Sequence, residues 1–132
     1  MEKPRCVVLP TCLPYKRVAT RSVHFVDDVL TVELQGEGFI WLRAVFRAVV
    51  GFRVLDERDL CEFWNEHSEP NGWLYEVAEG GWMELEKQRQ WFSSPEIFSD
   101  LREYLLVDNM CVSVLCRATP ELESLGAPPR PS

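Results

Sequence analysis

The chain has no long apolar runs. The apolar run nearest its start covers only residues 6–9, and Pro10 and Pro14 lie close behind it. A signal-peptide core needs about 7–15 apolar residues, and a membrane-spanning helix needs about 20. We therefore expect a cytoplasmic protein that has no secretion signal and no membrane contact.

The cysteines follow no disulfide or metal pattern. There are five of them, none is in a CxxC pair, and His24 and His67 are the only histidines. Small disulfide-held proteins carry even numbers of cysteines, and zinc sites usually place ligands about two to four residues apart. We expect five reduced thiols that pack as small apolar side chains, and no metal site.

Catalytic motifs are also absent. The sequence has no GxGxxG, GxxxxGK[ST], GxSxG or HExxH, and Cys61 and His67 flank a helix end without pointing at each other. Neighbouring carboxylates can divide acid and base work, so Glu76, Glu84 and Glu86 leave a carboxylate hydrolase as an alternative. A solvated strand face produces the same pattern, and we expect a protein without catalytic residues or cofactors.

Basic residues are scarce in the middle of the chain. Residues 53–104 hold five basic and thirteen acidic side chains, a charge of -8, whereas residues 1–52 carry +2 and the whole chain -7. Phosphate backbones repel such a segment and basic proteins attract it, although acidic charge also simply favours solubility. We expect no nucleic-acid binding.

Composition divides the chain into three parts. Residues 1–20 contain three prolines and are expected to form an irregular arm, with one strand near residues 6–9. Residues 119–132 are rich in proline, glycine and serine and are expected to form a flexible tail. The hydrophobic fraction is 46%, enough for a core, and we place a single domain at residues 21–118.

The first predicted strands surround two tight reversals. Residues 22–26 and 29–35 flank Asp27-Asp28, and a loop at residues 36–38 places Leu34 opposite Ile40. This register also sets Val32 opposite Leu42 and Leu30 opposite Ala44, and it leaves Trp41, Arg43 and Arg47 on the other face. The following run to residue 55 is too long for one strand, and Gly51 is the expected site of a bulge.

Two short helices are predicted. One covers residues 55–64, capped by Asp56, with an apolar stripe formed by Leu60, Phe63 and Trp64. The other starts at Ser94-Pro95-Glu96, because serine caps helices and proline suits the first turn, and it places Ile97 and Leu101 on one face.

Two further hairpins complete the predicted fold. The first joins residues 73–78 to 82–87 through a loop at 79–81, with Val77 opposite Met83 and Tyr75 opposite Leu85. It buries those four residues and Trp73, and it turns Leu74, Glu76, Trp82, Glu84 and Glu86 outward. The second joins residues 103–107 to 110–117 at Asp108-Asn109. The predicted class is α+β, with six or seven antiparallel strands in a hairpin-rich sheet and two short helices.

Trp82 is the strongest candidate for a binding residue. In the predicted hairpin it lies beside Leu74 among carboxylates, and an aromatic ringed by charge is typical of a protein interface. The helix at residues 94–101 could instead cover it as a second core. The candidate partner-binding residues are Leu74, Glu76, Trp82, Glu84 and Glu86, with Glu62, Glu66 and Glu69 at the end of the first helix.

The run GFRVLDERDL…FW…GWLYEV…GGWMELE…REYLLVDNMCVSVL, within residues 51–115, resembles small bacterial immunity proteins of the polymorphic-toxin type. Those proteins are cytoplasmic antidotes to secreted antibacterial toxins and share no catalytic residues. The resemblance implies a toxin inhibitor that binds its cognate toxin one to one and blocks the active site. The acidic middle segment suits a toxin with a basic cleft, such as a nuclease or a nucleotide-using transferase.

Other functions fit the same residues. A loading chaperone or adaptor would bind a non-catalytic region of a secreted effector, and a nucleic-acid mimic would need acids spaced like phosphates. The carboxylate hydrolase is the third alternative. The sequence leaves the toxin, the bound face and the oligomeric state open.

Overall fold

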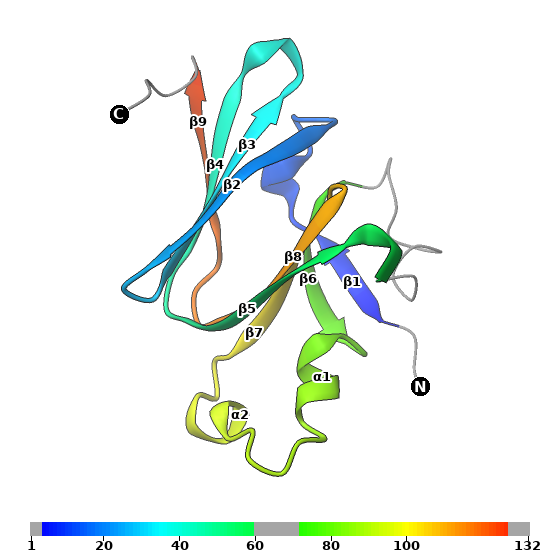
Figure 1. Ribbon diagram of the computed structural model, residues 1–132, viewed down its shortest axis with the longest axis vertical. Helices are drawn as coiled ribbons and strands as arrows, with labels where there is room; N and C mark the ends of the chain where they lie inside the picture. Colours follow the sequence, from blue (N-terminus) through cyan, green and yellow to red (C-terminus); the bar gives the residue numbers. More distant parts are fainter. Residues whose placement is uncertain (1–3, 60–71, 127–132) are drawn as a thin grey trace.

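Alternating apolar and polar residues build two antiparallel sheets (Figure 1). The computed structural model describes residues 4–59 and 72–126. The strands are β1 Arg5–Val8, β2 Val18–Val26, β3 Val29–Gly36, β4 Trp41–Phe46, β5 Val49–Asp56, β6 Leu74–Glu79, β7 Arg102–Leu106, β8 Met110–Cys116 and β9 Glu121–Gly126. The helices are α1 Trp82–Glu86 and α2 Ser94–Ile97, with 3-10 turns η1 Pro10–Cys12 and η2 Glu37–Phe39. The α+β class with two short helices is confirmed, and the described residues form nine strands in place of the predicted six or seven.

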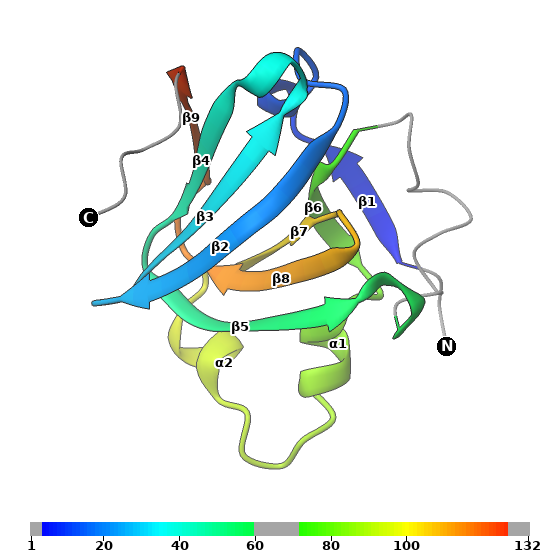
Figure 2. The same cartoon turned by 45° about the horizontal axis from the view of Figure 1, so that its top comes forward.

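The two sheets enclose one core. The order is β1-β6-β7-β8-β5 in the larger sheet and β2-β3-β4-β9 in the smaller one. Leu30, Leu34 and Phe46 of the smaller sheet pack in the same buried cluster as Leu106 and Val114 of the larger one. Both helices lie on one side of the larger sheet, away from the smaller sheet (Figures 1 and 2).

The first hairpins confirm the predicted faces but not the predicted register. Asp27 and Asp28 form the β2–β3 turn with positive φ angles of 50° and 66°. Leu34 pairs with Leu42, and not with Ile40, because the loop includes η2 and is longer than predicted. The shift is two residues, so the remaining apolar side chains of β3 and β4 still face the core, whereas Ile40 is exposed.

The long run after residue 39 bends earlier than predicted. β4 ends at Phe46, and Ala48 turns the chain with a φ of 53°. The bulge predicted at Gly51 is present, because the β5–β8 register shifts between Val49 and Gly51.

The predicted hairpin of residues 73–87 is wrong. β6 pairs with β1 and β7, while residues 82–86 form α1, so the pairing of Val77 with Met83 does not exist. Trp73, Tyr75 and Val77 are buried as predicted, but Leu85 is exposed and Leu74, predicted outward, is 0% exposed. Leu74 is covered because the face of β6 predicted to be outward faces the core between the sheets.

Both chain ends contain strands. β1 confirms the strand predicted near residues 6–9, and it lies along the edge of β6. The tail predicted from residue 119 is corrected, because β9 pairs with β4 and Leu122 packs against the core. The strand forms there because it supplies backbone partners to the otherwise open edge of β4.

Of the two predicted helices, only the second lies wholly within the described residues. Leu55 and Asp56, which were predicted to start the first helix, belong to β5. The predicted stripe of Leu60, Phe63 and Trp64 lies outside the described residues. α2 forms with Pro95 in its first turn, as predicted, but Ser93 is its N-cap and gives no side-chain hydrogen bond. Ile97 is exposed and Leu101 lies beyond the end of α2, so their predicted shared face is wrong.

None of the helices within residues 4–59 and 72–126 has the length and apolar character needed to cross a membrane.

Candidate protein-binding surface

A buried carboxylate holds the start of α1. Glu103 of β7 is 2% exposed and lies on the face of the larger sheet that points away from the shared core. Its two oxygens accept hydrogen bonds from the backbone N–H groups of Trp82 and Met83, at 2.9 and 2.8 Å. Burial raises the pKa of the Glu103 carboxyl, and these two hydrogen bonds oppose the rise.

Gly81 permits this close approach. A Cβ atom on Gly81 would lie 2.5 Å from Oε2 of Glu103 and 2.6 Å from Cγ1 of Val77. Both distances are far below van der Waals contact, so the residue before α1 needs to lack a side chain. The fit brings the two N–H groups of α1 to the carboxylate.

Trp82 packs onto β5. The guanidinium of Arg53 lies 5.2 Å from the centre of the Trp82 ring, within the range of a cation–π contact. A Cβ atom on Gly51 would lie 3.6 Å from Cη2 of Trp82, which is ordinary contact. The indole Nε1 donates to Oε1 of Glu86 at 3.0 Å. Trp82 is therefore half-buried, and its contacts attach α1 to the sheet.

The predicted outward face is not formed. Glu84 and Glu86 lie on α1, whereas Glu76 lies on β6 and accepts a hydrogen bond from Arg102 at 3.1 Å. Glu84 pairs with Lys87 at 3.3 Å. The carboxylate trio considered for a hydrolase is therefore divided between two elements.

Glu86 is the most constrained of these carboxylates. Hydrogen bonds from Arg89 and Trp82 lower the pKa of its carboxyl, the one from Arg89 having the larger effect. Leu74 is buried, and the predicted binding residues Glu62, Glu66 and Glu69 lie outside the described residues.

The chain from α1 through α2 carries exposed apolar side chains. We call residues 82–100 the α1–α2 segment, which projects beyond the larger sheet (Figures 1 and 2). Trp91 is 82% exposed and Ile97 66% exposed, and Leu85 is also exposed. Large apolar side chains so exposed on one projecting segment are typical of a protein-binding surface.

The far end of the segment is also fastened to the sheet. Nε of Arg117, just after β8, donates to Oδ1 of Asp100 at 2.9 Å. The same guanidinium lies 4.5 Å from the centre of the Phe98 ring. The segment is thus held near both ends, with Trp91 between the two attachments.

Sequence reasoning missed Trp91 and Glu103. Trp91 stands in the stretch QRQWFSS, which has no apolar period, so no strand or helix pattern draws attention to it. The only available signal is an aromatic pair isolated among polar residues. Glu103 resembles any polar strand end in the sequence. It is a buried residue because β6 and β8 lie on either side of β7 and the start of α1 packs on its carboxylate.

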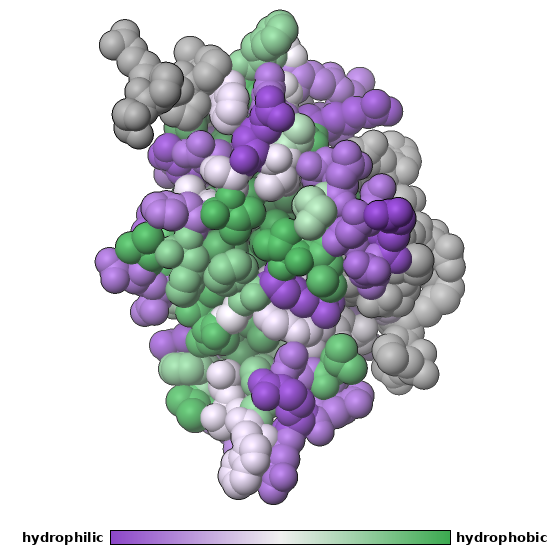
Figure 3. Space-filling view, in the orientation of Figure 1, coloured by the Kyte–Doolittle hydropathy of each residue, from purple (hydrophilic) through white to green (hydrophobic). Residues whose placement is uncertain are grey.

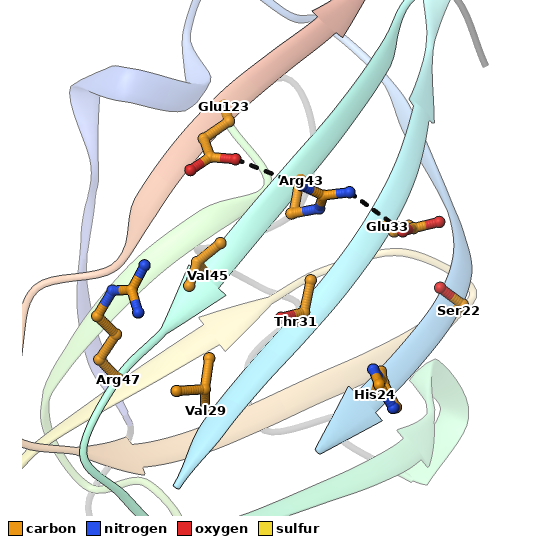
Figure 4. Close-up of a pocket in the computed structure, with 9 residues that line it drawn as sticks. All are labelled: Ser22, His24, Val29, Thr31, Glu33, Arg43, Val45, Arg47 and Glu123. Carbon is orange, nitrogen blue, oxygen red and sulfur yellow. Dashed lines mark ion pairs between the residues drawn. The ribbon is translucent and has the colours of Figure 1, made fainter. Parts of the chain in front are cut away.

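A hollow of about 360 Å³ lies on the outer face of the smaller sheet (Figure 4). Its residues are Ser22, His24, Val29, Thr31, Glu33, Arg43, Val45, Arg47 and Glu123. Arg43 lies between Glu33 and Glu123, at 3.6 and 3.7 Å, and Arg47 lies 3.6 Å from Glu121. The charges of this hollow are thus compensated by neighbours, as on a solvated sheet face.

Neither a metal-binding cluster nor a disulfide occurs in the described part of the chain. Residues 4–59 and 72–126 contain no group of three His, Cys, Asp or Glu side chains placed to hold an ion. Within the same ranges, no disulfide joins Cys6, Cys12, Cys111 or Cys116.

Comparison with protein-family models, with curated proteins and with solved structures found no match to this chain.

Proposed function

We propose that this protein is a non-catalytic inhibitor that binds another protein through the α1–α2 segment. The observation that carries the proposal is the exposure of Trp91, Ile97 and Leu85 on a projecting segment fastened near both ends. Tryptophan is enriched among the residues that dominate binding energy at interfaces. Trp91 is the central anchor in this proposal, and Trp82 positions the segment.

The attachments favour tight binding. A loop that is already ordered loses less conformational entropy on association than a mobile one. The hydrogen bonds to Glu103 and the contact of Trp82 with Arg53 order the start of the segment, and Arg117 orders its end. A larger share of the favourable contact energy then contributes to the binding affinity.

The charge of the segment suits a basic partner. Residues 82–100 hold four acidic and two basic side chains, and residues 53–104 together carry -8. Such charge mainly speeds association, and salt weakens its effect. The segment is therefore complementary to a partner protein whose surface has an apolar pocket surrounded by basic residues.

The inhibitory role extends the resemblance to toxin-immunity proteins. In this proposal the partner is a secreted antibacterial toxin with a basic active-site cleft, and the α1–α2 segment enters the cleft. The complex would form in the cytoplasm of the cell that makes the inhibitor. The adaptor alternative differs because it leaves the partner's active site open.

The test compares two exposed aromatic residues. Trp91→Ala and Phe39→Ala each remove an aromatic ring, 82% and 78% exposed, from places outside the core. Proteins retained from a native lysate by immobilised wild type are identified, and the retained protein is purified for kinetic binding measurements. We expect Trp91→Ala to dissociate at least tenfold faster and Phe39→Ala to bind as wild type does. Equal binding by all three proteins would refute the α1–α2 segment as the interface.

A second measurement separates an inhibitor from an adaptor. The activity of the purified partner is assayed with increasing wild type or Trp91→Ala. An inhibitor abolishes activity near equimolar wild type, and Trp91→Ala needs a higher concentration. Full partner activity in a saturated complex would favour the adaptor.

A further inference from the structure

We infer that the free edge of β5 is a second docking surface, which takes an extended, basic segment of another protein as an added strand. The surface is the β2–β5 seam, defined by Phe25, Val26, Val50, Phe52, Val54 and Met110. It shares no residue with the α1–α2 segment and does not depend on the function proposed above.

β5 has a strand partner on one side only. It pairs with β8 and is the last strand of its sheet, and β2 is likewise the first strand of the smaller sheet. No backbone hydrogen bond among the described residues joins β2 to β5. An edge strand of this kind offers unpaired N–H and C=O groups to an incoming strand.

The seam beside this edge is apolar. The rings of Phe25 and Phe52 lie 5.2 Å apart and connect the two edge strands. Phe52 and Val54 are two residues apart and share a face, and Met110 lies opposite Asp56 at the end of that face. Phe25, Val26, Val50, Val54 and Met110 are all exposed. Figure 3 shows apolar surface gathered where β2 and β5 lie.

Carboxylates stand at both ends of the seam. At one end are Asp27 and Asp28, where the backbone of Asp28 accepts a hydrogen bond from Val49 at the start of β5. At the other end Asp56 closes β5, and Glu57 and Asp59 follow it. Arg58 pairs with Asp56 at 3.0 Å, and residues 56–59 together still carry a charge of -2.

These features select one kind of occupant. Main-chain pairing with β5 requires an extended chain, and the eight residues of β5 span roughly 26 Å. Alternate apolar side chains of that chain would cover Phe52 and Val54. Lysine or arginine at both of its ends would meet the carboxylates, and such charge pairs steer association.

The experiment uses a synthetic peptide of about nine residues, matched to the eight of β5, with valine and threonine alternating between lysine pairs. Full-length protein is titrated while backbone amide resonances are followed by NMR, and affinity is measured by calorimetry. We expect the largest shifts along β5 and weaker binding at high salt. Absence of binding at millimolar peptide, or shifts that leave β5 unchanged, would overturn the inference.

Two controls separate strand addition from unspecific attraction. Val54→Lys places a cation in the seam, and Val7→Lys makes the same change on β1, the opposite edge of the same sheet; their valines are 37% and 59% exposed. We expect at least tenfold weaker binding by Val54→Lys and unchanged binding by Val7→Lys. A peptide N-methylated at alternate residues cannot pair and should also bind at least tenfold more weakly. If that peptide binds as well as the parent, the docking is not strand addition.

Discussion

Gly81 is a position at which a single added Cβ atom should disturb the packing. Its missing Cβ is the space that the Glu103 carboxylate and Val77 occupy, at 2.5 and 2.6 Å from where that atom would lie. Gly81→Ala should therefore destabilise the protein by about 1–3 kcal/mol, the usual cost of forcing an extra carbon into a packed site. Urea unfolding gives the value.

Gly36→Ala is the matched control. Its Cβ would meet the nearest atom, the carbonyl oxygen of Ile40, at an ordinary 3.6 Å. The free energy of unfolding should change by less than about 0.5 kcal/mol. Equal effects of the two substitutions would show that the Gly81–Glu103 fit is not a tight one.

Glu103 makes stability depend on pH in a direction opposite to that of most paired carboxylates. Burial raises the pKa of its carboxyl in the folded protein above the unfolded value. The stabilising contribution of Glu103 is therefore fully present below the unfolded pKa and is lost as pH rises through the folded pKa. The free energy of unfolding of wild type minus that of Glu103→Gln should fall as pH rises from about 4.

Urea unfolding of both proteins at several pH values between about 4 and 7 measures this difference. Glu103→Gln removes the titration and keeps the size of the side chain, so groups common to both proteins cancel. A difference that grows with pH would mean that the hydrogen bonds from Trp82 and Met83 outweigh burial.

The two thiols of β8 should react slowly. Burial raises the pKa of Cys111 and of Cys116 to about 11 each, so each thiol is ionised in only about one molecule in a thousand at pH 8. Iodoacetamide should modify half-exposed Cys6 before these two, which should react only after denaturation. Peptide mass spectrometry of timed samples distinguishes the sites. Rapid native labelling of Cys111 would contradict its burial.

At the scale of elements, β9 closes the smaller sheet. It forms the ladder with β4 between residues 41–45 and 121–126, and Leu122 packs against the core. A chain ending at Thr119 should lose this ladder and expose the edge of β4. We expect its melting temperature to fall by more than about 5 °C, measured by calorimetry.

Glu121→Ala controls for the charge removed with β9. Glu121 pairs with Arg47 only across exposed side chains, and such pairs contribute little. Its melting temperature should stay within about 2 °C of wild type. A shortened chain that melts like wild type would show that β9 contributes little to stability.

At the scale of the whole molecule, the shared core joins the sheets into one unit. Phe46 of β4 and Tyr104 of β7 lie 6.3 Å apart between ring centres, and one buried cluster includes residues from both sheets. Separation of the two sheets would expose that cluster to water. Thermal unfolding should therefore be a single transition.

Near-ultraviolet and far-ultraviolet circular dichroism should give the same midpoint in that transition. Tryptophan fluorescence of the wild-type protein provides a third signal, because the indole of Trp73 is buried in the shared core. Two separated transitions in the wild-type protein would mean that the sheets unfold as independent units.

Local pattern was enough to predict the hairpins of β2–β3 and β7–β8, the bulge at Gly51 and the start of α2. Each depends on neighbours in sequence: the alternation of side chains, the turn residues Asp27-Asp28, or a proline in a first turn. The acidic charge of residues 53–104 is likewise a property of the sequence alone.

Tertiary structure decided the rest. Residues 82–86 form a helix whose first backbone N–H groups bind Glu103, twenty-one positions beyond Trp82. Leu74 is buried because its face of β6 packs against the smaller sheet. β9 is a strand because β4 offers it an edge. Local sequence specifies which conformations are accessible, whereas distant partners decide which one satisfies the buried backbone groups and removes the apolar side chains from water.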